Sequence, residues 1–175
     1  KMLGLQVITI HTAPNCVLQP EMLEKVLKVY PTARAIALNS PGNPTGVVYS
    51  KADLEALAVI LKKYNTLAIS DEIYSAYTYE TEAPSIAAVL PEQSLIVSGL
   101  SKSHAMPGYR IGYVAGPKSL IQLIGKVHRS IVTSAPNPMM AAATTALQVG
   151  APIIAEHRTL LQQRRDFVIE ILDKL

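Results

Sequence analysis

Short apolar runs alternate with longer segments of helical period along this chain, and this alternation constrains its fold more than any other feature. Strand-length runs separated by helices are typical of a mainly parallel sheet, because parallel neighbours need a crossover connection between them. The runs are rich in branched apolar residues, as in strands that are covered on both faces. The pattern therefore predicts an α/β fold in which a mainly parallel sheet carries helices on both faces.

Local end signals place the individual elements. Pro20 suits the first position of a helix, and Ser50 with Asp53 forms a capping-box pattern ahead of another helix. The expected strands are Gln6 to Ile10, Ala33 to Leu38, Thr66 to Ser70, Ser94 to Ser98 and Arg110 to Ala115. The expected helices are Pro20 to Tyr30, Lys51 to Tyr64, Lys118 to Val132, Met139 to Val149 and Pro152 to Leu175.

Composition and charge exclude several classes of protein. Of the 175 residues, 49% are hydrophobic and 17% are charged, which excludes collagen-like and disordered chains. The net charge is +3 and the basic residues are scattered, so nucleic acid is not an expected partner. Cys16 is the sole cysteine, which excludes an internal disulfide and a cysteine-based metal site and favours a cytoplasmic location. No uninterrupted apolar run reaches the roughly 18 residues that cross a bilayer, so no membrane contact is expected.

Chemically reactive side chains gather in the loops that follow three of the expected strands. Open parallel sheets bind ligands beyond the carboxyl ends of their strands. The loops are NSPGNPTG at 39–46, DEIY at 71–74 and GLSKSHAMPGYR at 99–110. They supply an amide, a carboxylate, a phenol, an amine and a guanidinium from Asn43, Asp71, Tyr74, Lys102 and Arg110.

Each of these residues also has an ordinary structural interpretation. An aspartate directly after a strand, such as Asp71, commonly caps the following turn. Lys102 alone is more often a solvated lysine, and Arg110 alone is more often a surface ion-pair partner. Ser101 can be a plain loop hydroxyl, and His104 a packed or exposed histidine. The order and spacing of the whole set, rather than any one member, favours a common site.

Three motifs together resemble the pyridoxal-phosphate-dependent class I/II aminotransferases of the fold-type-I group. They are NSPGNPTG at 39–46, SDEIY at 70–74 and SGLSKSHAMPGYRIGYVAGP at 98–117. The last is the most specific, because a serine stands directly before Lys102 and Arg110 follows eight residues after it. The resemblance runs from about Gln6 to Phe167 and implies the three-layer large domain of that group, in incomplete form.

The resemblance implies a role for each residue of the catalytic set. Lys102 would form the Schiff base with the aldehyde of pyridoxal 5'-phosphate and would move a proton at the substrate α-carbon. Asp71 would pair with the pyridine nitrogen of the cofactor. Tyr74 and Asn43 would hydrogen-bond the phenolic oxygen of its ring. Lys102, Asp71 and Tyr74 are thus the expected catalytic residues.

The resemblance also implies a phosphate site, with two departures from the family pattern. Arg110 and Ser101 would bind the cofactor phosphate, since a guanidinium fork matches a phosphate dianion. Gly99 stands where many relatives carry a serine, and Ser98 lies one place earlier. The segment PGYR at 107–110 stands where the family often has TGWR. Similar sequences occur in the related aminocyclopropane-carboxylate synthases.

The implied function is the transfer of an amino group between an amino acid and a 2-oxo acid by a homodimeric enzyme. A β-lyase, a cyclopropane-forming synthase and a non-catalytic aminotransferase-like sensor domain remain open. Residues 1–150 would be the central part of the cofactor-binding large domain, and 151–175 a helix that leads toward a small domain. Arg158, Arg164 and Arg165 lie on that helix and are expected to be solvated, so none matches the arginine that grips the substrate carboxylate.

Overall fold

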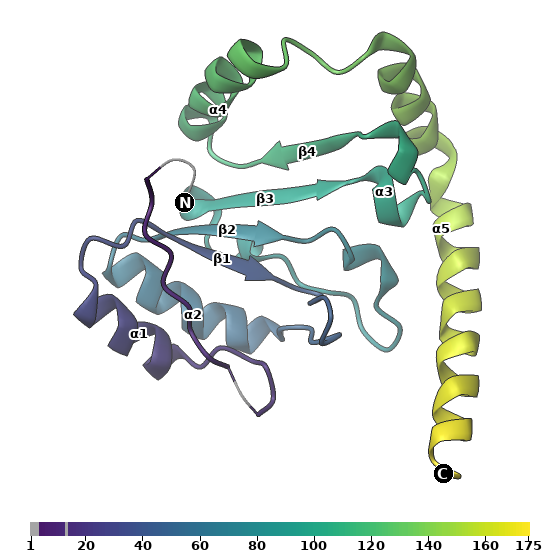
Figure 1. The fold of residues 1–175 in the computed structure, drawn as a ribbon, viewed down its shortest axis with the longest axis horizontal. Helices are drawn as coiled ribbons and strands as arrows, with labels where there is room; N and C mark the ends of the chain where they lie inside the picture. The colour runs from purple at the N-terminus through teal and green to yellow at the C-terminus, as the bar shows by residue number, and fades with distance from the viewer. Residues whose placement is uncertain (1–3, 13) are drawn as a thin grey trace.

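A computed structural model describes residues 4–12 and 14–175 and confirms the α/β class. One sheet contains β1 (Ala35–Asn39), β2 (Leu67–Asp71), β3 (Ser94–Gly99) and β4 (Gly112–Ala115), in that spatial order (Figure 1). The first three strands are parallel, and β4 runs antiparallel to β3. The carboxyl ends of the three parallel strands therefore meet at one edge of the sheet.

Within the described residues, five α-helices and four short 3-10 helices connect and flank the strands. The α-helices are α1 (Pro20–Val29), α2 (Lys51–Lys63), α3 (Leu100–Ser103), α4 (Lys118–Ile131) and α5 (Asn137–Leu172). The 3-10 helices are η1 (Ser75–Tyr77), η2 (Ile86–Ala88), η3 (Pro91–Gln93) and η4 (Pro107–Tyr109). The predicted capping box is confirmed, because Ser50 Oγ accepts from the Asp53 amide and the Asp53 carboxylate accepts from the Ser50 amide.

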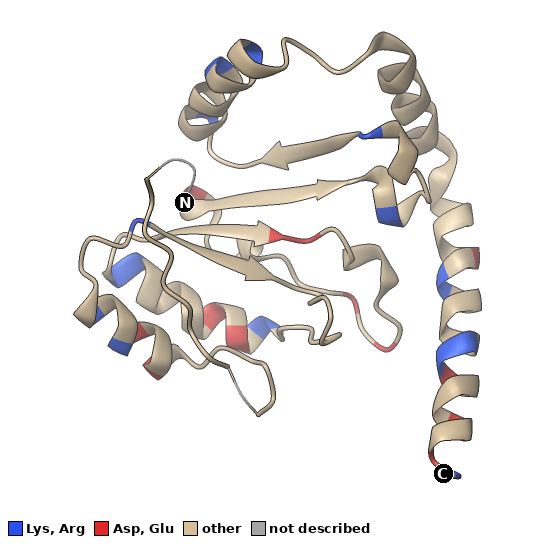
Figure 2. Cartoon of the chain, viewed as in Figure 1, with Lys and Arg blue, Asp and Glu red and all other residues tan. Residues whose placement is uncertain are grey.

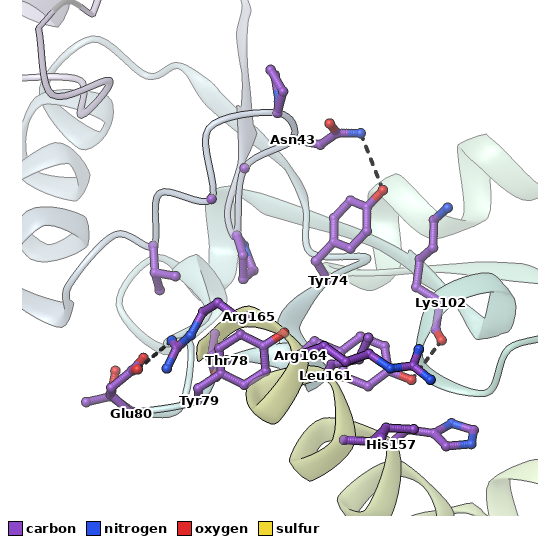
Figure 3. A pocket seen from close by; sticks show the side chains of 18 of the residues that line it. Asn43, Tyr74, Thr78, Tyr79, Glu80, Lys102, His157, Leu161, Arg164 and Arg165 are labelled. Carbon is purple, nitrogen blue, oxygen red and sulfur yellow. Dashed lines mark hydrogen bonds and ion pairs between the residues drawn. The ribbon is translucent and has the colours of Figure 1, made fainter. Parts of the chain in front are cut away.

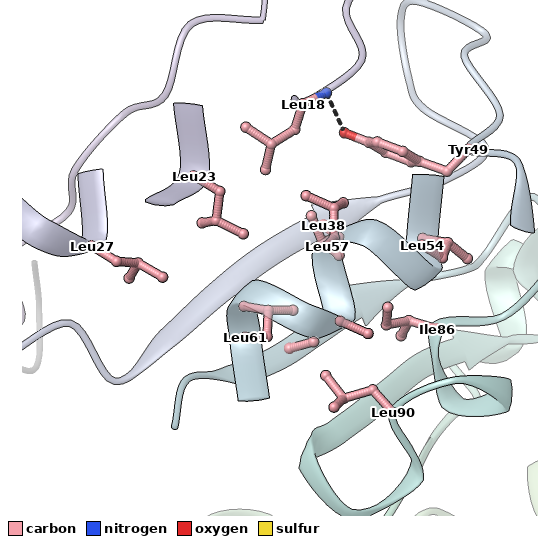
Figure 4. Close-up of a cluster of buried hydrophobic side chains, with 12 residues drawn as sticks. Leu18, Leu23, Leu27, Leu38, Tyr49, Leu54, Leu57, Leu61, Ile86 and Leu90 are labelled. Carbon is pink, nitrogen blue, oxygen red and sulfur yellow. Dashed lines mark hydrogen bonds between the residues drawn. The ribbon is translucent and has the colours of Figure 1, made fainter. Parts of the chain in front are cut away.

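The hydrophobic core lies between one face of the sheet and helices α1 and α2 (Figure 4). Leu57 and Leu61 of α2 are fully buried there, and removing such side chains from water contributes about 1.5–3 kcal/mol each. Tyr49 closes one side, where its hydroxyl accepts a 3.1 Å hydrogen bond from the Leu18 amide. The cluster fixes β1 and β2 and with them the loops at their carboxyl ends.

The second helical layer is incomplete among the described residues. The strand predicted at Arg110 to Ala115 is observed as the shorter β4, in which every residue is exposed. It is antiparallel because the segment that joins it to β3 holds only α3 and η4 and makes no full crossover. Helix α4 has no buried residue. Coverage of both sheet faces, as the sequence pattern predicts, is thus seen on one face only.

Two element predictions are wrong for reasons that lie outside the local pattern. Gln6 to Ile10 forms no strand, because an extended apolar run becomes a strand only where another strand pairs with its backbone. Val7 in this run is 70% exposed. The helices predicted on either side of Pro152 are one helix, α5. A proline removes a single amide donor, and the carbonyl freed on an exposed helix can bond to water.

The continuity of α5 bears on two further expectations. The predicted division between 150 and 151 falls inside this helix and stays a prediction. By length and composition α5 is also long and apolar enough to cross a membrane, with a mean hydropathy of 1.3 over 18 residues, of which 11% are buried. Polar residues interrupt the apolar runs of this helix, so no single run in the sequence predicts this average. One such helix is weak evidence for a membrane, because helices of soluble proteins pass the same test.

Candidate active site

The carboxyl edge of the sheet brings the three sequence motifs together. Asn39 at the end of β1 pairs with Asp71 at the end of β2, and Asp71 pairs with Val97 of β3. The loop 39–46, the turn 71–74 and helix α3 therefore leave the sheet side by side. In Figure 2 the end of β2 is acidic, whereas α3 is basic. The sequence prediction that these motifs share one edge is confirmed.

Four of the predicted residues line a single cavity of about 890 Å³, namely Asn43, Tyr74, Ser101 and Lys102 (Figure 3). The Asn43 amide Nδ2 donates to the Tyr74 hydroxyl at 3.4 Å. The Lys102 amine Nζ lies 5.6 Å from the centre of the Tyr74 ring. The amide, the phenol and the amine thus form one polar wall.

The loop 39–46 holds Asn43 through its own side chains and turns. Asn39 bridges the loop to β2, because its Nδ2 donates to the Asp71 carbonyl at 3.2 Å and its Oδ1 accepts from the Asn43 amide at 2.8 Å. The Gly42 amide donates to the Val47 carbonyl at 2.8 Å. Gly46 has a φ of +70°, which side-chain-bearing residues rarely adopt. Gly46 is therefore needed for the turn that presents Asn43.

Asp71 and Arg110 do not line the cavity. The Asp71 carboxylate accepts from the Ile73 amide at 3.1 Å, which is the turn-capping arrangement. Arg110 adopts a left-handed backbone with a φ of 57°, and its Nη1 donates to the Pro107 carbonyl at 2.9 Å. Both side chains are exposed at the carboxyl edge of the sheet. Their roles toward a cofactor stay predictions.

The departure at Gly99 has a steric cause. A Cβ at this position would lie 2.8 Å from the Ile111 carbonyl oxygen and 2.9 Å from the Gly112 Cα. A serine side chain at this position would therefore not fit this backbone. Ser98 is not a free substitute, because its hydroxyl donates to the Glu72 carbonyl at 3.5 Å.

The opposite wall of the cavity contains residues that no sequence motif assigns to a site. They come from the segment after Tyr74 and from α5: Tyr77, Thr78, Tyr79, Glu80, Thr81, His157, Leu160, Leu161, Arg164 and Arg165. No local pattern in the sequence relates these two segments, because they lie far apart along the chain, at 77–81 and 157–165. Only the folded arrangement places them around one cavity.

Arg165 contradicts the expectation that the last arginines are solvated. Its Nη1 lies 2.6 Å from Glu80 Oε1, its guanidinium carbon lies 4.6 Å from the centre of the Tyr79 ring, and its side chain is 33% exposed. The hydrogen bond from Arg165 lowers the pKa of Glu80 below its ordinary value. The same contact raises the pKa of Arg165. This pair joins α5 to the loop after η1.

The family profile described as "Aminotransferase class I and II" matches residues 1–175 of this chain. The chain belongs to the class I/II aminotransferase family.

Individual class I/II aminotransferases agree with this assignment. The chain is 37% identical over 166 residues to a probable N-acetyl-LL-diaminopimelate aminotransferase of Bacillus subtilis, which covers 95% of this chain and 42% of that protein. It is 36% identical over 177 residues to an aspartate/prephenate aminotransferase of Thermus thermophilus, which covers 98% of this chain and 46% of that protein. The chain thus spans less than half the length of these relatives.

Solved aminotransferase structures share the fold. A Thermus thermophilus aspartate aminotransferase tetra mutant superimposes with a TM-score of 0.91 at 36% identity, over 97% of this chain and 47% of the other. An aromatic aminotransferase from Pyrococcus horikoshii OT3 gives a TM-score of 0.84 at 33% identity, over 91% of this chain and 44% of the other. The four-stranded sheet therefore matches part of the large domain of such enzymes.

The polar wall suits pyridoxal phosphate, the cofactor on which this family depends. Among the described residues, the Lys102 amine has no carboxylate partner, so it is available to an aldehyde. The hydroxyl of Tyr74 and the amide of Asn43 can donate to a ring oxygen. The cavity is also within the size range of small-molecule sites. The donor set therefore fits the cofactor.

Proposed function

We propose that the intact protein is an aminotransferase that moves an amino group between an amino acid and a 2-oxo acid with pyridoxal 5'-phosphate. The observation that carries this proposal is the polar wall, in which Asn43, Tyr74 and Lys102 of three separate motifs surround one cavity. Membership of the class I/II aminotransferase family supports it independently.

Different residues of the site would hold different parts of the cofactor. Lys102 would bind its aldehyde carbon, and Tyr74 with Asn43 would orient its ring through the phenolic oxygen. Asp71 would hold a proton at the pyridine nitrogen, while Arg110 and Ser101 would bind the phosphate. For the exposed side chains of Asp71 and Arg110, this requires them to turn from their present backbone partners.

Lys102 would also act on the substrate. When bound, the cofactor supplies an electron sink that makes the substrate α-carbon acidic. The amine of Lys102 would then act as the base that accepts the proton from the substrate α-carbon. Its position beside the Tyr74 ring places that amine at the wall that would hold the cofactor.

Amino-group transfer by the intact protein tests the proposal. Aspartate, aromatic amino acids and diaminopimelate-type donors would be supplied with 2-oxoglutarate, and glutamate formation would be measured. Lys102→Ala removes the expected base and should lower the rate by about 100-fold to 10,000-fold. Lys118→Ala, at the start of α4 and outside the site, is the matched control. Wild-type rates in Lys102→Ala would contradict the proposal.

Product analysis separates the remaining enzymatic alternatives. A β-lyase would release a thiol from cysteine thioethers without any 2-oxo acid acceptor, and a cyclopropane-forming synthase would release a ring-closed amino acid. Binding of the cofactor without any turnover would indicate a sensor domain. Each of these results would replace transamination as the function.

A further inference from the structure

Tyr77 connects η1 to the helix that carries Lys102. Its hydroxyl donates to the main-chain carbonyls of Lys102 and Ser103, with both oxygens at 3.1 Å. A phenol has one proton, so the two carbonyls share it. Tyr77 is half-buried, and burial raises the pKa of its phenol. The group is therefore a stable donor at neutral pH.

Helix α3 depends on such an outside contact because it is only four residues long. Its closing bonds run from the His104 amide to the Leu100 carbonyl at 3.2 Å and from the Ala105 amide to the Lys102 carbonyl at 3.1 Å. The last carbonyls of a helix lack partners within the helix. In the part of the chain that the structure describes, Tyr77 is the one side chain from outside 99–104 that hydrogen-bonds α3.

Tyr77 also contacts Tyr74, the phenol of the polar wall, through the main chain. The Tyr77 amide donates to the Tyr74 carbonyl at 2.9 Å. One unbroken link therefore runs from the backbone of Tyr74 through the ring of Tyr77 to the backbone of Lys102. The two residues that this link joins carry the phenol and the amine of the polar wall, where Lys102 Nζ lies 5.6 Å from the centre of the Tyr74 ring.

We propose that Tyr77 is a positioning residue that sets the main chain of Lys102 relative to Tyr74. The expected effect on catalysis rests on the proposed function. The hydrogen bonds from Tyr77 to the backbone of Lys102 and Ser103 are observed in the structure itself. The hydroxyl acts through the backbone of Lys102 and bonds no reacting group. Its loss leaves the Lys102 amine chemically unchanged but lets the backbone that carries it move.

Tyr77→Phe in the intact protein removes the hydroxyl and keeps the ring. Misplacing a catalytic group by a fraction of an ångström slows chemistry more than binding, so kcat should fall about tenfold while KM stays within about twofold. Tyr64→Phe is the matched control, because its hydroxyl donates to Glu24 at 3.2 Å beside the end of α2, away from the cavity. It loses a phenol hydrogen bond without touching α3, and its kcat should equal that of the wild type.

Two further readouts do not need turnover. In the absence of cofactor, hydrogen exchange of the amides of 102–106 should be faster in Tyr77→Phe than in the wild type and in Tyr64→Phe. With pyridoxal phosphate and borohydride, the labelling of Lys102 should be slower in Tyr77→Phe. Unchanged exchange at 102–106, or unchanged kcat where the wild type is active, would overturn the inference. Absence of amino transfer in the wild type would defeat the proposed function alone, since hydrogen exchange still decides the role of Tyr77.

Discussion

At the scale of single residues, the contact between Asn43 and Tyr74 gives the polar wall its shape. Asn43→Ala removes the 3.4 Å hydrogen bond to the Tyr74 hydroxyl and one donor for the cofactor ring. A hydrogen bond contributes about 1 kcal/mol, so the Kd for pyridoxal phosphate should rise about fivefold. An absorbance titration of the intact protein measures this. Asn15→Ala, which loses only a turn bond to Val17, should leave the Kd unchanged; equal affinities in all three proteins would contradict the role of Asn43.

The buried carboxylate of Glu72, next to Asp71, depends on nearby hydroxyl donors. Glu72 is 8% exposed, and its Oε1 accepts from the hydroxyls of Ser70 at 3.1 Å and Ser85 at 2.9 Å. Ser85→Ala deprives this carboxylate of a donor and should lower the free energy of unfolding by about 1–2 kcal/mol. Chemical denaturation measures the loss. The exposed Ser75→Ala is the control, and a stability of Ser85→Ala equal to that control would contradict the account of Glu72.

Site residues that stand in a short sequence motif can be predicted from the sequence. Residues whose partners lie far along the chain cannot. Asn43, Tyr74 and Lys102 are recognisable because each stands in a short pattern of turn and polar residues. Tyr77 reaches a helix 25 residues away, and the Arg165 side chain pairs with a carboxylate 85 residues away. No spacing rule relates such partners, since the overall fold and not a local period brings them together.

Among helices and strands, predictions that rest on local sequence are confirmed, and those that depend on distant parts of the chain are wrong. Helix α2 is predicted well because its capping box and its apolar period are local properties of the sequence. The run at 6–10 is not a strand, because pairing depends on where other strands lie. Pro152 does not end α5, because a proline removes only one amide donor and the carbonyl that it frees can bond to water.

The contact between α5 and the loop after η1 predicts a dependence on pH. The pKa of Glu80 is lowered by the hydrogen bond from Arg165, so folding favours the charged carboxylate. Its stabilising contribution is present above the unfolded value of 4.5 and is lost as the pH falls through the lower folded value. Glu80→Gln should therefore have a lower Tm than the wild type at neutral pH. This difference should shrink steadily below pH 4.5.

Thermal unfolding of both proteins over a pH series measures this effect. The Glu24–Lys63 ion pair is present in both proteins, so its own titration cancels in the difference. High salt should also reduce the difference, because both Glu80 and Arg165 are partly exposed. A difference that is constant from neutral to acid pH would show that the charge of Glu80 does not hold α5.

At the scale of the whole molecule, α4 presents an apolar face that nothing described in the structure covers. Leu123, Val127 and Ile131 are 58%, 60% and 76% exposed and recur every four residues, so they lie on one face of the helix. We expect the protein to associate through this face. Val127→Lys with Ile131→Lys should weaken association about tenfold or more, as measured by sedimentation velocity over a concentration series.

A lysine elsewhere controls for charge alone. Val59→Lys replaces a valine that is 65% exposed on α2, a different helix from α4. Its sedimentation should match that of the wild type. If the α4 double variant and the wild type show the same concentration dependence, this face does not mediate self-association.

We propose Lys102 as the residue that binds pyridoxal phosphate. The direct measurement is borohydride reduction of the intact protein with the cofactor, followed by peptide mapping of the phosphopyridoxyl group. We predict one modified peptide, labelled at Lys102, with a loss of label in Lys102→Ala and no loss in Lys118→Ala. Label spread over surface lysines, or concentrated at a lysine other than Lys102, would contradict the assignment of this active site.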